Sequence, residues 1–106
     1  MVEFDQYKYS LSQYAEPLKE LKSALQLDQK KEQIAELSMY MEDPNFWNDP
    51  EKSGEITKKL KNLQDTVKEY NGLEQQYEDI ETLIEMGNET EDPDLVEEVK
   101  AEFDDF

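Results

Sequence analysis

The sequence predicts an all-α protein, an antiparallel helical bundle of three long helices plus a partial fourth. Apolar residues recur every three or four positions along most of the chain, which is the spacing of one face of a helix. No segment is a candidate for a β-strand. Two Asp-Pro steps stand directly before apolar stripes, where a helix N-terminus is expected.

The first predicted helix has one apolar stripe. Its members are separated alternately by three and four positions: Phe4, Tyr7, Leu11, Tyr14, Leu18, Leu21 and Leu25. Pro17 lies inside this segment but off the stripe. A proline within a helix removes one backbone hydrogen bond and clashes with the preceding turn. We therefore expect a kink at Pro17, with a split into two helices near Pro17 as the alternative.

A second helix is predicted from about Gln29 to Met41, with Asp28 as its N-cap. Its apolar face contains Leu27, Ile34, Leu37 and Met41. Because only a few residues separate it from the first helix, the two are expected to fold back as an antiparallel hairpin.

The third predicted helix is the longest and opens at Asp49-Pro50. Its apolar positions are Ile56, Leu60, Leu63, Val67, Tyr70, Leu73, Tyr77, Ile80 and Ile84. Asn71-Gly72 alone would predict a hairpin turn, but helical spacing continues on both sides of it. We therefore expect one helix of roughly 35 residues, about 50 Å long. Gly87 stands where a C-terminal glycine cap is expected.

Asp92-Pro93 repeats the same opening, and apolar residues follow with helical spacing at Leu95, Val96, Val99, Phe103 and Phe106. The last residues are acidic, which the dipole of a helix C-terminus disfavours. We expect residues 1–106 to form a single domain, a fragment of a longer chain cut within its last helix. That helix would expose Val99, Phe103 and Phe106 and promote some self-association.

The composition limits the function classes. The 106-residue chain has a formal net charge of −17, no cysteine and no histidine, and all eleven basic residues are lysine. Such a chain repels nucleic acid and suits a basic protein partner, although solvated helix faces explain the same charge. Without a signal peptide or a long apolar run, it is expected to be soluble and cytoplasmic, with no membrane contact.

No residue is assigned as catalytic, cofactor-binding or metal-binding, and the chain is not predicted to be an enzyme. Carboxylates are numerous, but they lie opposite the apolar stripes, where no pocket would separate two pKa values. Asn88, Thr90, Asp92 and Asp94 alternate as in a calcium loop. The loop is rejected because the required glycine is Pro93 and the required glutamate is Val99. The chain needs no cofactor.

The segment Pro44-Asn45-Phe46-Trp47-Asn48-Asp49-Pro50 is the one stretch that is not generic, and it holds the only tryptophan. The two aromatic residues have two interpretations. They pack into the end of the bundle, or they form an exposed anchor for a partner. Burial is favoured because aromatic area of this size is normally buried. Tyr40 lies off the apolar stripes, where isolated exposed tyrosines are ordinary.

This segment, with Leu27-Asp28, Lys30-Lys31-Glu32 and Glu36-Leu37, resembles the bacterial class I peptide chain release factors. Within that family it is similar to the branch that reads UGA and UAA, because the other branch lacks the Phe-Trp-Asn loop. The resemblance extends more loosely over the whole chain. It implies the N-terminal helical domain of a factor that triggers hydrolysis of peptidyl-tRNA in the ribosomal A site.

The resemblance also implies what this segment does within such a factor. Family members read the stop codon with a Ser-Pro-Phe tripeptide and need a Gly-Gly-Gln motif for hydrolysis, and neither is present here. The implied partners are the stalk base of the large ribosomal subunit and the class II release-factor GTPase. The competing hypothesis is a free-standing acidic coiled-coil adaptor or chaperone-like bundle, which would not need the Phe-Trp-Asn loop.

Overall fold

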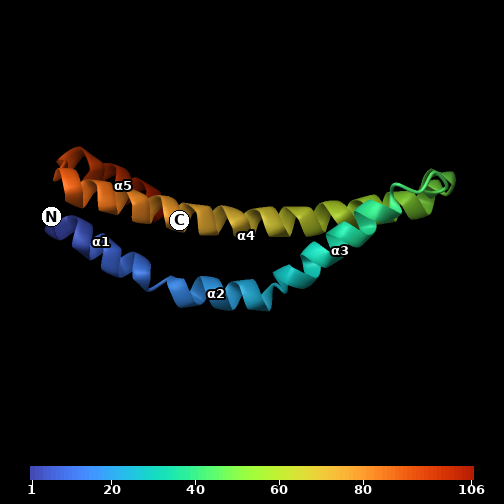
Figure 1. Ribbon diagram of the computed structural model, residues 1–106, viewed down its shortest axis with the longest axis horizontal. Coiled ribbons are helices and arrows are strands. Elements are labelled where there is room, and N and C mark those ends of the chain that lie inside the picture. The colour runs from blue at the N-terminus through green and yellow to red at the C-terminus, as the bar shows by residue number, and fades with distance from the viewer. The chain divides into compact units, whose positions relative to one another are not determined.

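The computed structural model describes residues 1–106 and is built from helices alone (Figure 1). Its elements are α1 (Val2–Ser12), α2 (Ala15–Ala24), α3 (Leu27–Tyr40), the 3₁₀-helix η1 (Phe46–Asn48), α4 (Pro50–Thr90) and α5 (Pro93–Asp105). Helix makes up 87% of the chain and there is no strand, so the all-α prediction is confirmed. The prediction of three long helices plus a partial fourth is wrong, because there are five α-helices. None of them has the length and apolar character that a membrane-spanning segment requires.

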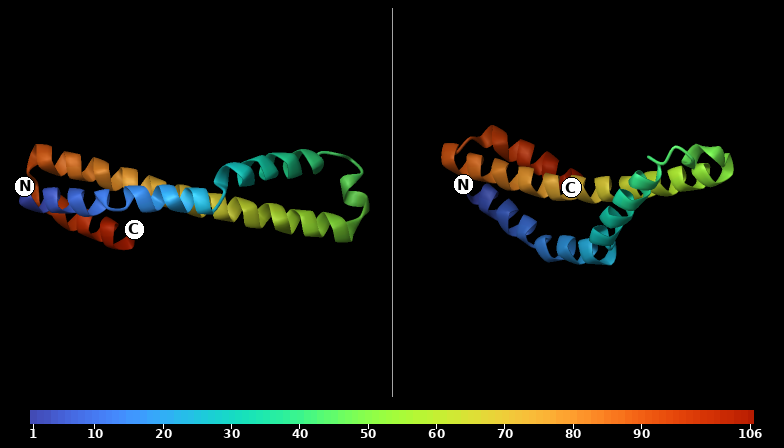
Figure 2. Two further views of the ribbon diagram at one scale, coloured as in Figure 1. Left: turned by 90° about the horizontal axis from the view of Figure 1, so that it is seen from below. Right: turned by 45° about the vertical axis from the view of Figure 1, so that its right-hand side comes forward.

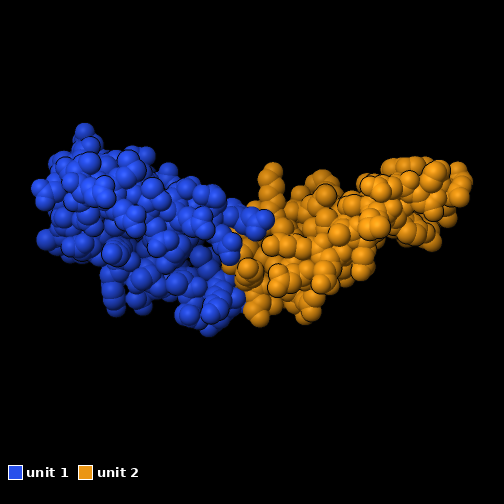
Figure 3. Space-filling model, in the orientation of Figure 1, with its two compact units in different colours: residues 1–21, 71–106 blue, residues 22–70 orange.

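The chain forms two compact units, coloured separately in Figure 3. Unit 1 contains residues 1–21 and 71–106, and unit 2 contains residues 22–70. Helix α4 contributes its C-terminal part to unit 1 and its N-terminal part to unit 2. The single domain over residues 1–106 and a single antiparallel bundle remain predictions.

Unit 1 has one apolar core shared by three helices. Its fully buried side chains are Phe4 and Leu11 from α1, Ile80 and Ile84 from α4, and Val99 from α5. Figures 1 and 2 show these three helices side by side. The stripes predicted for the first, third and last helices therefore meet in this core, and each helix buries the face that its sequence makes apolar.

The apolar face of α5 is covered rather than exposed. Val99 has no exposed surface, and Phe103 and Phe106 are only partly exposed. The Phe103 ring lies edge-on to Tyr7 with 5.7 Å between ring centroids, and Phe106 lies edge-on to Tyr14 at 5.5 Å. The prediction that these residues form an exposed stripe is wrong, and so the reason for expecting self-association is gone.

Gly87 does not cap a helix, which corrects the sequence-based expectation. It lies inside α4 and is buried, and α4 continues to Thr90. A Cβ atom at this position would collide with the ring of Phe4. The residue is a glycine because α1 packs its phenylalanine directly on the backbone of α4. The chain leaves α4 at Glu91, which has a left-handed φ of 51°.

The first predicted helix is split, as in the alternative prediction. Helix α1 ends at Ser12 and α2 begins at Ala15, so the break lies at Gln13 and Tyr14. Pro17 sits in the first turn of α2, where its missing N–H leaves no hydrogen bond unmade. Its ring would clash with the carbonyl of residue 13 in a continuous helix, which explains why the break lies four residues before the proline.

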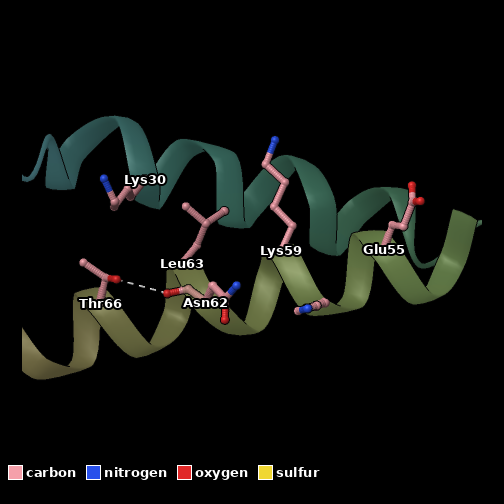
Figure 4. Close-up of a pocket in the computed structure, with 7 residues that line it drawn as sticks. Lys30, Glu55, Lys59, Asn62, Leu63 and Thr66 are labelled. Atoms are coloured by element: carbon pink, nitrogen blue, oxygen red, sulfur yellow. Dashed lines mark hydrogen bonds between the residues drawn. The ribbon is translucent and has the colours of Figure 1, made fainter.

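Helix α3 starts two residues earlier than predicted. The residue before it is Gln26, with a left-handed φ of 53°, so Asp28 lies in the first turn rather than at the N-cap. The predicted hairpin of the first two helices stays a prediction, since residues 1–21 belong to unit 1 and α3 to unit 2. Within unit 2, α3 lies beside the first part of α4, as Figure 4 shows.

Helix α4 continues without interruption through Asn71-Gly72, so the prediction of one long helix is confirmed. It has 41 residues, which corresponds to a length of about 60 Å. In unit 2 it contributes Leu60, Leu63 and Tyr70 to the buried residues, and α3 contributes Leu27.

Candidate functional site: the aromatic loop

The loop between α3 and α4 is held by two aspartates, each followed by a proline. The Oδ1 atom of Asp43 accepts a hydrogen bond from the amide of Asn45 at 2.9 Å, and the Asp43 carbonyl accepts one from the amide of Phe46 at 2.9 Å. At the other end Asp49 Oδ1 accepts from the amide of Lys52 at 3.1 Å. Asp49 therefore caps α4, as predicted, and the loop has a defined shape.

Phe46 and Trp47 differ sharply in exposure. Phe46 is 7% exposed, whereas Trp47 is 58% exposed, so the prediction that both are buried is wrong for the tryptophan. Both belong to the 3₁₀-helix, in which consecutive side chains point about a third of a turn apart. One of two neighbours can therefore face the unit while the other projects from it.

Phe46 links two exposed aromatic rings. Its ring is edge-on to Trp47 with centroids 4.7 Å apart, and edge-on to Tyr40 with centroids 5.6 Å apart. Tyr40, at the end of α3, is 47% exposed. A buried phenylalanine thus fixes a tyrosine and a tryptophan in place while leaving about half of each in solvent.

A hollow of 220 Å³ lies next to these rings. It is lined by Tyr40, Asp43, Asn45, Phe46, Asp49 and Lys52. Lys52 Nζ lies 5.8 Å from the centroid of the Tyr40 ring, within the range of a cation–π contact. The lysine forms no ion pair with either aspartate. We call the loop from residue 41 to 49, together with Tyr40 and Lys52, the aromatic tip.

Unit 2 has a second, shallower feature between α3 and α4, drawn in Figure 4. It is lined by Lys30, Glu55, Lys58, Lys59, Asn62, Leu63 and Thr66. Lys58 and Lys59 form no ion pair, but Lys30 donates to the carbonyl of Leu25 at 2.5 Å and Glu55 stands among the lysines. The groove therefore carries less unopposed charge than its three lysines suggest, and the aromatic tip is the better-defined site.

Unit 1 has a small hollow of 110 Å³ between α1 and α4. It is lined by Lys8, Leu11, Ser12, Tyr77, Glu81, Ile84 and Glu85. Burial raises the pKa of Tyr77 above its usual 10.0, and the nearby negative charge of Glu81 raises it further. The phenol is therefore neutral at physiological pH. A protonated phenol is a weak nucleophile.

The residues that resembled a calcium loop have structural roles. Asn88 Oδ1 accepts a hydrogen bond from the ammonium of Met1 at 3.0 Å, and its amide donates to Asp5 at 3.4 Å. Asp92 caps α5 by accepting from the amide of Asp94 at 2.9 Å. Nowhere in the chain do three or more acidic side chains converge in a metal-binding arrangement.

Charge divides unevenly between the units. Unit 1 has three lysines against eighteen acids, a formal charge of −15, and unit 2 has eight lysines against ten acids, a charge of −2.

Sequence reasoning recognised Trp47 but did not connect it with Tyr40 and Lys52. Their positions on either side of the loop, at the last residue of α3 and in the first turn of α4, were the available signal.

Comparison with known proteins identifies relatives of the whole chain. Residues 30–106 match the model of the PCRF domain family. The chain is 31% identical over 101 residues to peptide chain release factor 2 of Petrotoga mobilis, covering 95% of this chain and 27% of the relative. For the same factor of Proteus mirabilis the identity is 32%, covering 98% and 28%. For that of Haemophilus influenzae it is 32%, covering 100% and 29%. The chain thus spans less than a third of these relatives.

Proposed function

Because the chain belongs to the PCRF domain family, we propose that it is the N-terminal helical module of a translation termination factor acting at UGA and UAA. The relatives that match nearly all of this chain carry the name peptide chain release factor 2. That family match is the observation that carries the proposal. The rest of such a factor would contain further domains.

The module itself would neither read codons nor catalyse. No Ser-Pro-Phe or Gly-Gly-Gln sequence occurs in it, and it has no histidine or cysteine. Hydrolysis by covalent or general-base catalysis needs a positioned nucleophile and base. We therefore assign it no catalytic, cofactor-binding or metal-binding residue, and no cofactor.

Its role would be to contact partners. We propose the stalk base of the large ribosomal subunit and the class II release-factor GTPase, reached in the cytoplasm through the full-length factor. A module with a charge of −17 favours contact with basic proteins over direct contact with nucleic acid or with anionic membranes. The aromatic tip supplies the type of exposed aromatic side chains that anchor protein interfaces.

A reconstituted termination assay tests the codon and catalytic assignments. The full-length factor that contains residues 1–106 should release peptide at UGA and UAA but not at UAG, whereas the isolated module should release none. Release by the isolated module would overturn its non-catalytic role, and release at UAG would overturn the codon assignment. The coding sequence downstream should encode Gly-Gly-Gln in the same reading frame.

Cosedimentation tests the partner assignment. Residues 1–106 should sediment with large ribosomal subunits and should be lost from subunits stripped of their stalk-base proteins. Equal sedimentation with stripped subunits would contradict the stalk-base assignment. The alternative function, a free-standing acidic adaptor or chaperone-like bundle, predicts a stop codon close after residue 106 and no effect of stripping.

A further inference from the structure

The aromatic tip presents two side chains of the kinds that dominate protein interfaces. Trp47 is 58% and Tyr40 is 47% exposed, although each has ring contact with the buried Phe46. Tryptophan and tyrosine are enriched among the residues that contribute most to binding. Because Phe46 already fixes their orientation, little side-chain freedom remains to be lost when a partner docks.

The hollow beside these rings is surrounded by acidic residues that would attract a cation. Asp43 and Asp49 each use their Oδ1 atom to accept a backbone hydrogen bond, at 2.9 and 3.1 Å, and no hydrogen bond reaches their Oδ2 atoms. From residue 42 to 51 the chain has four acids and no basic residue. The lining of the hollow therefore combines aromatic rings with carboxylates that can pair with an incoming cation.

Lys52 shows which chemistry the hollow accepts. Its ammonium lies 5.8 Å from the centre of the Tyr40 ring and makes no ion pair. The tyrosine therefore already carries one cation from its own chain. An exposed lysine is held there only weakly, so a better-matched cation can displace it.

We propose that the hollow of the aromatic tip binds an arginine side chain from a basic protein partner, with Trp47 packing against the same partner surface. A planar guanidinium stacks on aromatic rings and forms bidentate hydrogen bonds with carboxylates, which an ammonium cannot do. A nucleic acid is disfavoured because its phosphates meet the loop's acids. A second copy of the chain is disfavoured because it too carries −17. The proposal holds whether or not the chain acts in translation termination.

Trp47 makes the proposal directly measurable, because it is the only tryptophan. Its fluorescence should change saturably when the whole chain is titrated with hexa-arginine, change less with hexa-lysine, and stay constant with hexa-glutamate. A larger response to oligouridylate than to hexa-arginine would overturn the proposal in favour of RNA. A response to hexa-lysine equal to that for hexa-arginine would overturn the assignment of a guanidinium.

Matched variants distinguish binding in the hollow from general attraction between opposite charges. Asp43→Asn keeps the size of the side chain and an oxygen for the Asn45 amide, and it should weaken hexa-arginine binding about fivefold, the upper range for an exposed ion pair. Glu97→Gln removes the same charge from an exposed position of α5 and should have less than half that effect. Equal weakening by both would reduce the binding to net charge and overturn the proposal.

A variant of Lys52 tests whether this lysine occupies the position at which the arginine would bind. Lys52→Gln removes the competing cation and should tighten hexa-arginine binding more than Lys68→Gln, which removes the same charge from an exposed position farther along α4. Circular dichroism should confirm equal helix content in all four variants. Weaker binding in Lys52→Gln, or tightening no greater than in Lys68→Gln, would mean that the lysine does not occupy the binding position, and the proposal would fail.

Discussion

The contact between Phe4 and Gly87 depends on a single missing methyl group. Gly87→Ala should lower the free energy of unfolding by up to about 2 kcal/mol, because overpacking costs about 1–3 kcal/mol and the gain in helix propensity returns about 1 kcal/mol. The collision with the Phe4 ring is unavoidable unless α1 moves. Denaturant unfolding followed by circular dichroism measures the difference.

Gly72 provides the matched control in the same helix. A Cβ there meets no atom within 4 Å. Gly72→Ala should therefore stabilise the protein by about 0.5–1 kcal/mol through helix propensity alone. If both variants changed stability in the same direction, the close approach of α1 to α4 would not be the reason for Gly87.

The two aromatic neighbours of the loop should respond oppositely to truncation. Phe46→Ala should cost about 3 kcal/mol, since it removes a buried ring. Trp47→Ala should change stability by no more than about 0.5 kcal/mol, as exposed positions usually do. Thermal unfolding measures the stability of both variants. A large loss of stability in Trp47→Ala would show that the tryptophan is buried.

Tyr77 links stability to alkaline pH. Its folded-state pKa lies above the unfolded value of 10.0, mainly through burial, so the folded state holds the proton more tightly. Its contribution to stability is complete below pH 10.0 and is lost as the pH rises through the folded pKa. The free energy of unfolding of Tyr77→Phe should fall less steeply than that of the unchanged protein as the pH rises through that range. Identical pH profiles for the two proteins would show that Tyr77 is not linked to folding.

At the scale of residues, periodicity predicted the buried positions well. Phe4, Leu11, Ile80 and Ile84 were all placed on stripes and all are at most 2% exposed. It could not predict Trp47, because a stripe says nothing about a short loop in which backbone hydrogen bonds set the direction of each side chain. The residue type favoured burial of Trp47, but in the 3₁₀-helix its side chain points about a third of a turn away from that of the buried Phe46.

At the scale of elements, Pro17 should control the break between α1 and α2. Pro17→Ala removes the ring that would clash with the carbonyl of residue 13 and restores an N–H donor. We expect the two helices to join through Gln13 and Tyr14, with a gain in ellipticity at 222 nm. An unchanged spectrum would indicate that packing of α1 in unit 1, rather than the proline, sets the break.

Helix starts were predictable where the signal is local. Asp49 and Asp92 each precede a proline, and both cap the helix that follows by accepting a hydrogen bond from its first turn. The other boundaries depend on contacts distant in sequence. Gln26 adopts a left-handed conformation without being glycine, and Gly87 is required by Phe4 rather than by a helix end.

At the scale of the whole molecule, repulsion between like charges should limit stability. The net charge is −17, and both ion pairs are exposed i,i+4 pairs of little energetic value. Raising the salt concentration from about 0.01 M to 1 M shortens the Debye length from about 30 to 3 Å. The melting temperature should rise by several degrees, which calorimetry measures.

Charge variants provide the control for this salt effect. Glu98→Lys in α5, an exposed position of unit 1, should raise the melting temperature at low salt and reduce the salt dependence. Lys19→Glu in α2 should do the opposite. A salt effect of equal size in all three proteins would point to general exclusion of the salt from the surface instead of screening.

The division of the chain into units also sets an order of events during synthesis. Unit 2 uses one continuous stretch, residues 22–70, whereas unit 1 must join residues 1–21 to residues 71–106. A ribosome adding about 5–20 residues per second needs about two to seven seconds to make those last 36 residues. Throughout that interval Phe4 and Leu11 are already made but have no core to enter. Helix α1 is thus translated before the rest of the unit 1 core and is among the last elements to pack.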